Sequence, residues 1–210
     1  RGCWRSRCWP KCCNSRGSDR LARKIMGVVL AAGASRRFGA RDKLATRTSG
    51  EAALVLRSAR KLQGLGLHRR AAITRSPRLP KELRGAGFDL LCIGARRAQS
   101  ASLHCAIRAA QASGASHLLI VLGDMPEVSR AHLRQLLKTP GPHPMMAASD
   151  GRLAPPALIP RRLFGAALRL TGDRGAGALL RRAPDLRRVA LPPGTLRDID
   201  RPEDLRNATE

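Results

Sequence analysis

A loop of small and basic residues carries the first recognisable chemistry. The segment LAAGASRRFG occupies residues 30–39, and Lys43 follows it. Small side chains let a backbone approach a nucleotide closely, and successive amides can hold phosphates. Arg37 and Lys43 add positive charge where triphosphate oxygens would lie. The segment is neither a Walker loop nor a dinucleotide fingerprint. Taken alone, these residues therefore allow either a phosphate site or a plain basic turn.

A carboxylate marks the second candidate segment, LGDMP at residues 122–126. Asp124 follows a continuous apolar run at residues 117–122, which is typical of a central parallel strand. An Asp in this place can hold Mg²⁺ through one oxygen while phosphates and water complete the octahedron. It can equally cap the next turn, so both interpretations stay open.

Strands and helices alternate along the sequence from Ile25 and must position these two segments. We expect strands at residues 25–32, 70–74, 88–93, 117–122, 145–148 and 189–191. We expect a helix at 51–62, a helical turn at 81–84, and Pro-rich loops with two helices after residue 148. Ser102 and Ser129 are predicted to cap two further helices, the second with Leu133, Leu136 and Leu137 facing inward. This alternation predicts a doubly wound α/β sheet, whose ligands bind beyond the carboxyl ends of the strands.

The composition argues against nucleic-acid and membrane partners. The 210 residues include 40 Lys and Arg against 15 Asp and Glu, a net charge of +25. Only 2% are aromatic, whereas proteins that bind single strands usually interleave aromatic platforms with basic residues. We therefore interpret the charge as a solvated Arg-rich surface. The apolar runs are too short to cross a bilayer, and nothing before Ile25 resembles a signal peptide, so we expect a cytoplasmic protein.

Residues 1–25 differ from the rest and are expected to be a basic, Cys-rich extension that is disordered or non-native. Four cysteines lie there with irregular spacing and no His, which disfavours a zinc site: Cys3, Cys8, Cys12 and Cys13. Met26 opens the first predicted strand, so translation could begin there, and residues 26–210 are predicted to form a single domain. Cys92 and Cys105 are expected to be small core residues.

Several ordered motifs resemble the MobA-like nucleotidyltransferases. LAAGASRRFGARDK resembles their nucleotide signature LAAGxSxRMGxxxK, and VLGDMP resembles their metal-binding segment. Further matches follow in the same order over residues 26–205: SASLHCAIRA, PPALIPRRLF, TGDRGAGALL and DIDRPEDL. The resemblance implies a three-layer α/β/α sandwich with a Rossmann-like, mostly parallel sheet of the nucleotide-diphospho-sugar transferase type.

Within that superfamily the sequence is most similar to molybdenum cofactor cytidylyltransferases. The guanylyltransferases usually read LAGG, and this chain has Ala32 at the third position, which the resemblance associates with cytosine. The implied reaction transfers CMP from CTP to the terminal phosphate of molybdopterin, with Mg²⁺ as cofactor and release of pyrophosphate. A molybdoenzyme that receives the product is an implied partner. Two alternatives stay open: a guanylyltransferase or phospholactate-type relative with another nucleotide or acceptor, and a non-enzymatic basic binding or molybdoenzyme-maturation protein.

The resemblance also implies roles for individual residues. The implied nucleotide-binding residues are Leu30, Ala31, Ala32, Gly33, Ser35, Arg37, Lys43, Ser100 and Ser102. Arg37, Lys43 and Asp124 are the implied catalytic residues, Asp124 and Asp200 the metal ligands, and Asp173 and Arg174 the acceptor-binding pair. Ser102 could equally be a helix cap alone, and Asp200 could cap a final helix at residues 201–206. The chain departs from the family pattern at His104, Cys105, Ala154 and Gly177, which leaves the acceptor open.

Overall fold

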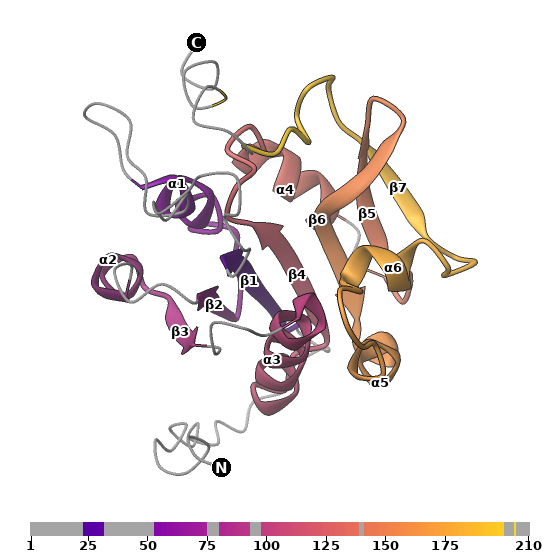
Figure 1. Ribbon diagram of the computed structural model, residues 1–210, viewed down its shortest axis with the longest axis horizontal. Coiled ribbons are helices and arrows are strands. Elements are labelled where there is room, and N and C mark those ends of the chain that lie inside the picture. Colours follow the sequence, from indigo (N-terminus) through magenta and orange to yellow (C-terminus); the bar gives the residue numbers. More distant parts are fainter. Residues whose placement is uncertain are drawn as a thin grey trace.

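A seven-stranded sheet forms the centre of the described structure (Figure 1). The computed structural model describes residues 23–31, 53–74, 80–92, 98–138, 141–199 and 204. The strands are β1 Ile25–Ala31, β2 Arg69–Thr74, β3 Asp89–Cys92, β4 His117–Leu122, β5 Met145–Ser149, β6 Arg152–Pro160 and β7 Arg187–Ala190. Their order is β3-β2-β1-β4-β6-β5-β7. Of the strands described, β6 alone runs antiparallel to its neighbours, so the sheet is mostly parallel, as predicted.

Helices cover both faces of the sheet and complete a three-layer α/β/α sandwich, which confirms the predicted fold class (Figure 1). The helices are α1 Leu54–Arg60, α2 Pro80–Gly85, α3 Gln99–Ala112, α4 Arg130–Leu137, α5 Phe164–Leu168 and α6 Ala176–Leu180, and a short 3-10 helix spans Arg161–Leu163. Alternate β1 side chains face opposite cores: Val29 packs on the side of α1, α2 and α4, and Val28 on the side of α3, α5 and α6. No described helix has the length and apolar character to span a bilayer.

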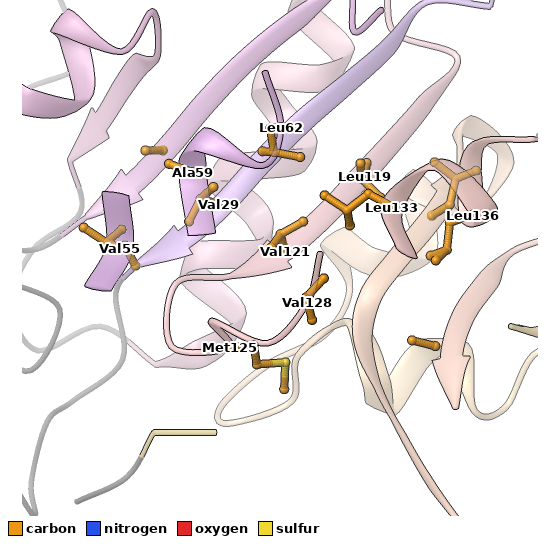
Figure 2. Close-up of a cluster of buried hydrophobic side chains, with 14 of the residues drawn as sticks. Val29, Val55, Ala59, Leu62, Leu119, Val121, Met125, Val128, Leu133 and Leu136 are labelled. Carbon is orange, nitrogen blue, oxygen red and sulfur yellow. The ribbon is translucent and has the colours of Figure 1, made fainter. Parts of the chain in front are cut away.

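The core on the α1 and α4 side lies beneath the edge of the sheet where β1 and β4 end and the two candidate segments begin. Figure 2 shows Val55 and Ala59 of α1, and Leu62 just after this helix, near Val29 of β1, and it shows Leu133 of α4 near Leu119 of β4. Burying such aliphatic side chains contributes about 1.5–3 kcal/mol each relative to leaving them exposed. The core therefore fixes α1 and α4 firmly against the strands that lead to the candidate site.

Two expectations about the elements are wrong. Ser102 does not cap α3, because the helix begins three residues earlier, after Ala98, and Ser102 is buried within its first turns. The Pro-rich segment after residue 148 is not a loop but contains the long strand β6. Its pairing with β5 shifts register between Met146 and Ala147, and Pro155 and Pro156 fall in that irregularity, where no ladder hydrogen bond from their nitrogens is needed.

A two-residue turn joins β5 to β6 and was also absent from the predicted elements. Asp150 and Gly151 have φ angles of 50° and 71°, which suit the Asp-Gly hairpin turn that follows the twist of its strands. The Asp150 carboxylate accepts hydrogen bonds from the Gly194 N–H at 2.8 Å and the Ser149 hydroxyl at 3.0 Å. These bonds, in that order, lower the pKa of Asp150 below its usual value. The Asp-Gly pair was the signal from which this hairpin could have been predicted.

Candidate active site

Strands β1 and β4 end side by side and bring the two candidate segments to one edge of the sheet. Leu30 is paired with Leu122 in the parallel register, and the Gly123 N–H donates to the Leu30 carbonyl at 3.0 Å. Ala31, the last described residue before the small-residue loop, is only 2% exposed. The chain therefore leaves β1 and β4 at adjacent points of the carboxyl edge, the place where a parallel sheet binds its ligands.

Asp124 lies just beyond β4, half-buried, on a segment that several elements hold in place. Its carbonyl accepts a hydrogen bond from the Ile199 N–H at 2.9 Å. Met125 and Val128 are both 1% exposed and pack into the core with Val121 (Figure 2). The carboxylate is thus presented at the sheet edge from a backbone that is anchored on both sides.

Helix α1 adds two side-chain hydrogen bonds to the same segment. The Ser58 hydroxyl donates to the Gly123 carbonyl at 3.3 Å, and the Lys61 ammonium donates to the Pro126 carbonyl. The pKa of Lys61 is lowered from 10.5 to about 8, first by burial and then by the nearby charge of Arg57, while the Glu127 carboxylate opposes the shift. Sequence reasoning missed both residues because neither lies in a motif and each bond joins positions 65 residues apart.

The start of α3 lies against the loop that carries the predicted acceptor-binding pair. The Ser100 N–H donates to the Gly172 carbonyl at 3.1 Å, and a Cβ added at Gly175 would approach the Gln99 side chain to 3.1 Å. Ser100 and Ser102 are buried. Asp173 and Arg174 are exposed on that loop. The structure therefore places the SxS and TGDRGA segments side by side.

Several predicted site residues lie outside the described part of the chain. They are Ala32, Gly33, Ser35, Arg37, Lys43 and Asp200. Their roles stay predictions. Leu30, Ala31, Ser100, Ser102, Asp124, Asp173 and Arg174 are described. Ile199, whose N–H binds the Asp124 carbonyl, directly precedes Asp200 in the sequence.

A divalent cation fits the described donors only if other ligands complete its coordination. Within the described residues, no three His, Cys, Asp or Glu side chains come together as a metal cluster. The Asp124 carboxylate is a hard oxygen donor at the sheet edge, and Mg²⁺ typically uses one or two carboxylates together with phosphate oxygens and water. The chemistry of this donor therefore suits a cation that arrives with a triphosphate.

A cavity of about 380 Å³ adjoins the Asp124 segment on the side of α4. Its lining includes Ile199, Glu127 and His132. The His132 Nδ1 accepts the Ser129 N–H at 3.2 Å, and Ser129 in turn caps α4, as predicted. Burial, and then the charge of Lys61, lowers the pKa of His132. These contacts give His132 a structural role at the helix terminus.

Other polar groups away from Asp124 differ in whether local structure satisfies their hydrogen bonds. His117 is 8% exposed and places its Nε2 2.9 Å from the Gly141 carbonyl. Asp198 accepts a hydrogen bond from Arg152 at 2.6 Å. His104, where the family pattern has Arg, buries its Nε2 without a hydrogen-bond partner in the described part of the chain. Cys105 is half-buried and forms no disulfide with another described cysteine, and the side chain of Cys92 is not described.

Comparison with known proteins gives a consistent family. The family model for the MobA-like NTP transferase domain matches residues 27–189. The purine catabolism protein PucB of Bacillus subtilis is 30% identical over 195 residues, which are 86% of this chain and 93% of PucB. The crystal structure of Rv0371c from Mycobacterium tuberculosis has a TM-score of 0.76 and 26% identity, covering 89% of this chain and 97% of Rv0371c. A manganese complex of Rv0371c has a TM-score of 0.70 at 23% identity, covering 89% of this chain and 98% of that one.

A Methanothermobacter nucleotidyl transferase shares the fold at greater sequence distance. It has a TM-score of 0.74 and 21% identity, covering 88% of this chain and 95% of that protein. The likeness at this distance concerns the fold.

Proposed function

The chain belongs to the MobA-like NTP transferase domain family, and on this premise we propose that it transfers CMP from CTP to the terminal phosphate of molybdopterin, releasing pyrophosphate. Family membership supports the nucleotidyl-transfer part of the proposal. The choice of cytosine is supported by Ala32 in the LAAG segment, and the choice of acceptor by the TGDRGA and DIDRPEDL segments.

One observation carries the proposal: the half-buried Asp124 stands at the carboxyl edge, beside the end of β1 and the start of the LAAGASRRFG loop. The hydrogen bond from the Gly123 N–H to the Leu30 carbonyl holds the end of β4 beside the end of β1. A carboxylate placed next to a phosphate-binding loop is what a metal-assisted transfer from a nucleoside triphosphate needs.

The proposed reaction is a displacement at the α-phosphorus of CTP. An oxygen of the molybdopterin phosphate forms a new bond to that phosphorus, the bond to the β-phosphate oxygen breaks, and pyrophosphate leaves with the electron pair. A phosphate monoester is already an anion at neutral pH, so the attack needs no strong general base. The main obstacle is repulsion between two polyanions, which makes alignment and charge neutralisation the principal tasks of the protein.

Each proposed residue has a share in these tasks. Arg37 and Lys43 would neutralise the triphosphate and the departing pyrophosphate. Ser100 and Ser102 would hydrogen-bond the nucleotide. Asp173 and Arg174, on the exposed loop beside α3, would meet the acceptor.

We propose Mg²⁺ as the cofactor, held by Asp124 and Asp200. When bound, the cation would supply positive charge to the triphosphate. The rigid mounting of Asp124 supports this role, because a ligand whose backbone is fixed loses little freedom on binding. The manganese complex of Rv0371c supports a divalent cation in this fold without selecting Mg²⁺.

A related transferase with another nucleotide or acceptor is the second candidate. The departures at His104 and Gly177 fall in segments matched to substrate binding, and they favour a changed acceptor. The relative PucB is named for purine catabolism, and that name specifies no acceptor.

Pyrophosphate release tests the proposal. Purified protein is incubated with Mg²⁺, molybdopterin, and either CTP or GTP. We expect release with CTP, and kcat about 10²-fold to 10³-fold lower in Asp124→Asn. Asp89→Asn is the matched control, because Asp89 is an exposed carboxylate of β3 whose ion pair with Arg69 is at the surface. A preference for GTP would overturn the cytosine assignment, and release with another phosphate acceptor but not with molybdopterin would overturn the acceptor.

A further inference from the structure

Side chains of α1 and its C-cap form hydrogen bonds to the backbone on both sides of Asp124. Ser58 donates to the carbonyl of the preceding residue, Gly123, and Lys61 donates to the carbonyl of Pro126, two residues after the carboxylate. Residues three apart on a helix lie on one face, one turn from each other. The one-turn spacing of the two donors therefore matches the length of the turn that presents Asp124.

The two donors break the otherwise apolar character of the buried face of α1. Besides Ser58, the buried residues of α1 are Leu54, Val55, Leu56 and Ala59, and Lys61, which caps the end of the helix, is half-buried. Ser58 is fully buried, at 0% exposure. Apolar packing is non-directional and would hold α1 on the sheet without fixing the rotation of a peptide group. Directional bonds to two carbonyls do fix it, because donor and acceptor must be aligned.

Placing the Lys61 ammonium here costs desolvation free energy, which an advantage elsewhere should offset. The ammonium is partly removed from water and lies near the Arg57 guanidinium, and its hydrogen bond goes to a neutral group, the Pro126 carbonyl. An apolar side chain of the same length would avoid that desolvation. The charged groups facing it from the packed elements are Arg57 on its own helix, Glu127 after β4, and the His132 imidazole on α4.

We infer that Ser58 and Lys61 are positioning residues that orient the Asp124 carboxylate for the divalent cation of the bound nucleotide. The inference rests on the proposed function, since it assigns the cation to Asp124. It also gives α1 a second task. The helix follows the predicted nucleotide loop in the sequence, so the same element connects that loop to the carboxylate.

Cation binding in the absence of acceptor tests the inference. The affinity for Mn²⁺ is measured by titration calorimetry and electron paramagnetic resonance with a non-hydrolysable α,β-methylene analogue of CTP. We expect Lys61→Met and Ser58→Ala to weaken Mn²⁺ binding by about tenfold, the lower end of the effect of removing a group that orients a metal ligand. Lys61→Arg, which keeps a donor and the charge, should recover part of the affinity. The analogue's affinity measured without metal should stay within about twofold of wild type, because the inference places neither residue against the nucleotide.

Matched controls separate orientation from general stability. Lys138→Met removes an exposed lysine at the end of α4. Ser113→Ala removes a serine that bonds a carbonyl, that of Ala110, at the far end of α3. Both controls should bind Mn²⁺ like the wild type. Thermal unfolding shows whether each variant is folded, and Ser58→Ala, which only deletes a hydroxyl, carries the test if Lys61→Met does not fold.

The outcomes distinguish the inference from the proposed function. If folded Ser58→Ala and Lys61→Met both bind Mn²⁺ as tightly as the wild type, the inference is overturned even if CMP transfer occurs. If the wild type binds Mn²⁺ and the analogue but does not transfer CMP to molybdopterin, the acceptor proposal fails while the expected weakening in the variants still supports the inference. A wild type without Mn²⁺ affinity would overturn both.

Discussion

Lys61→Met offers a quantitative test of the environment assigned to the half-buried Lys61 ammonium. Burial, the main cause, lowers the pKa of Lys61 from 10.5 to about 8 in the folded protein. Between these values the unfolded chain binds more protons than the folded one, so the wild type becomes more stable as pH rises through this window. Below pH 8 both states are protonated, and the fold bears the full cost of the desolvated charge.

The magnitude follows from the pKa difference and the remaining solvent contact. A pKa difference of one unit corresponds to about 1.4 kcal/mol, and a partly exposed group retains only part of the resulting free energy. We therefore expect wild-type protein to gain about 1–2 kcal/mol over Lys61→Met between pH 7 and pH 10. At pH 7 the two proteins should differ by less than about 1.5 kcal/mol, because losing the bond to the Pro126 carbonyl offsets the relief of desolvation.

Urea unfolding of both proteins at pH 7, 8, 9 and 10 provides the measurement. The difference between the two free energies of unfolding removes the titration of groups that both proteins share. A difference that stays constant with pH, or that moves in favour of Lys61→Met as pH rises, would refute the assigned environment.

Three further predictions concern the start of β1 and the cap of α4. A chain that begins at Met26 loses the Lys24 carbonyl, which accepts the Ser116 N–H at 2.8 Å, and should unfold at least about 1 kcal/mol more easily by urea titration. Ser129→Ala removes the cap of α4 and should cost about 1 kcal/mol, also by urea titration. The pKa of His132 is lowered on folding, so stability should fall as pH drops below 6.5, and His132→Gln should lose that dependence; an unchanged pH profile would contradict the role of its Nδ1.

The strands near the site could be predicted because their signals are local. Residues Leu118–Leu122 are all apolar, and β4 has the expected bounds, His117–Leu122. Ser129 caps α4 as its residue type suggests. The prediction that Ser102 caps α3 was wrong because the preference of serine for cap positions does not reveal where tertiary packing starts a helix. Helix α3 begins after Ala98. Strand β6 was missed because its prolines suggest a loop, while the irregular pairing that accommodates them depends on β5.

The support of Asp124 could not be predicted from the sequence at all. The motif gave the carboxylate and its place after a buried strand. The Ser58 and Lys61 bonds depend on how α1 packs on the sheet, and the bond from Ile199 joins segments far apart in the chain. Such contacts are set by tertiary packing, and periodicity within one segment carries no information about them.

Transfer of a labelled nucleotidyl group tests the central claim most directly. Protein, Mg²⁺ and molybdopterin are incubated with CTP that carries ³²P at either the α or the γ phosphate. The account predicts that the α label alone appears in a molybdopterin product, with one pyrophosphate released per product and with loss of both in Asp124→Asn. Label from the γ phosphate in the product, or no α label in any acceptor while the protein is folded and binds CTP, would contradict it.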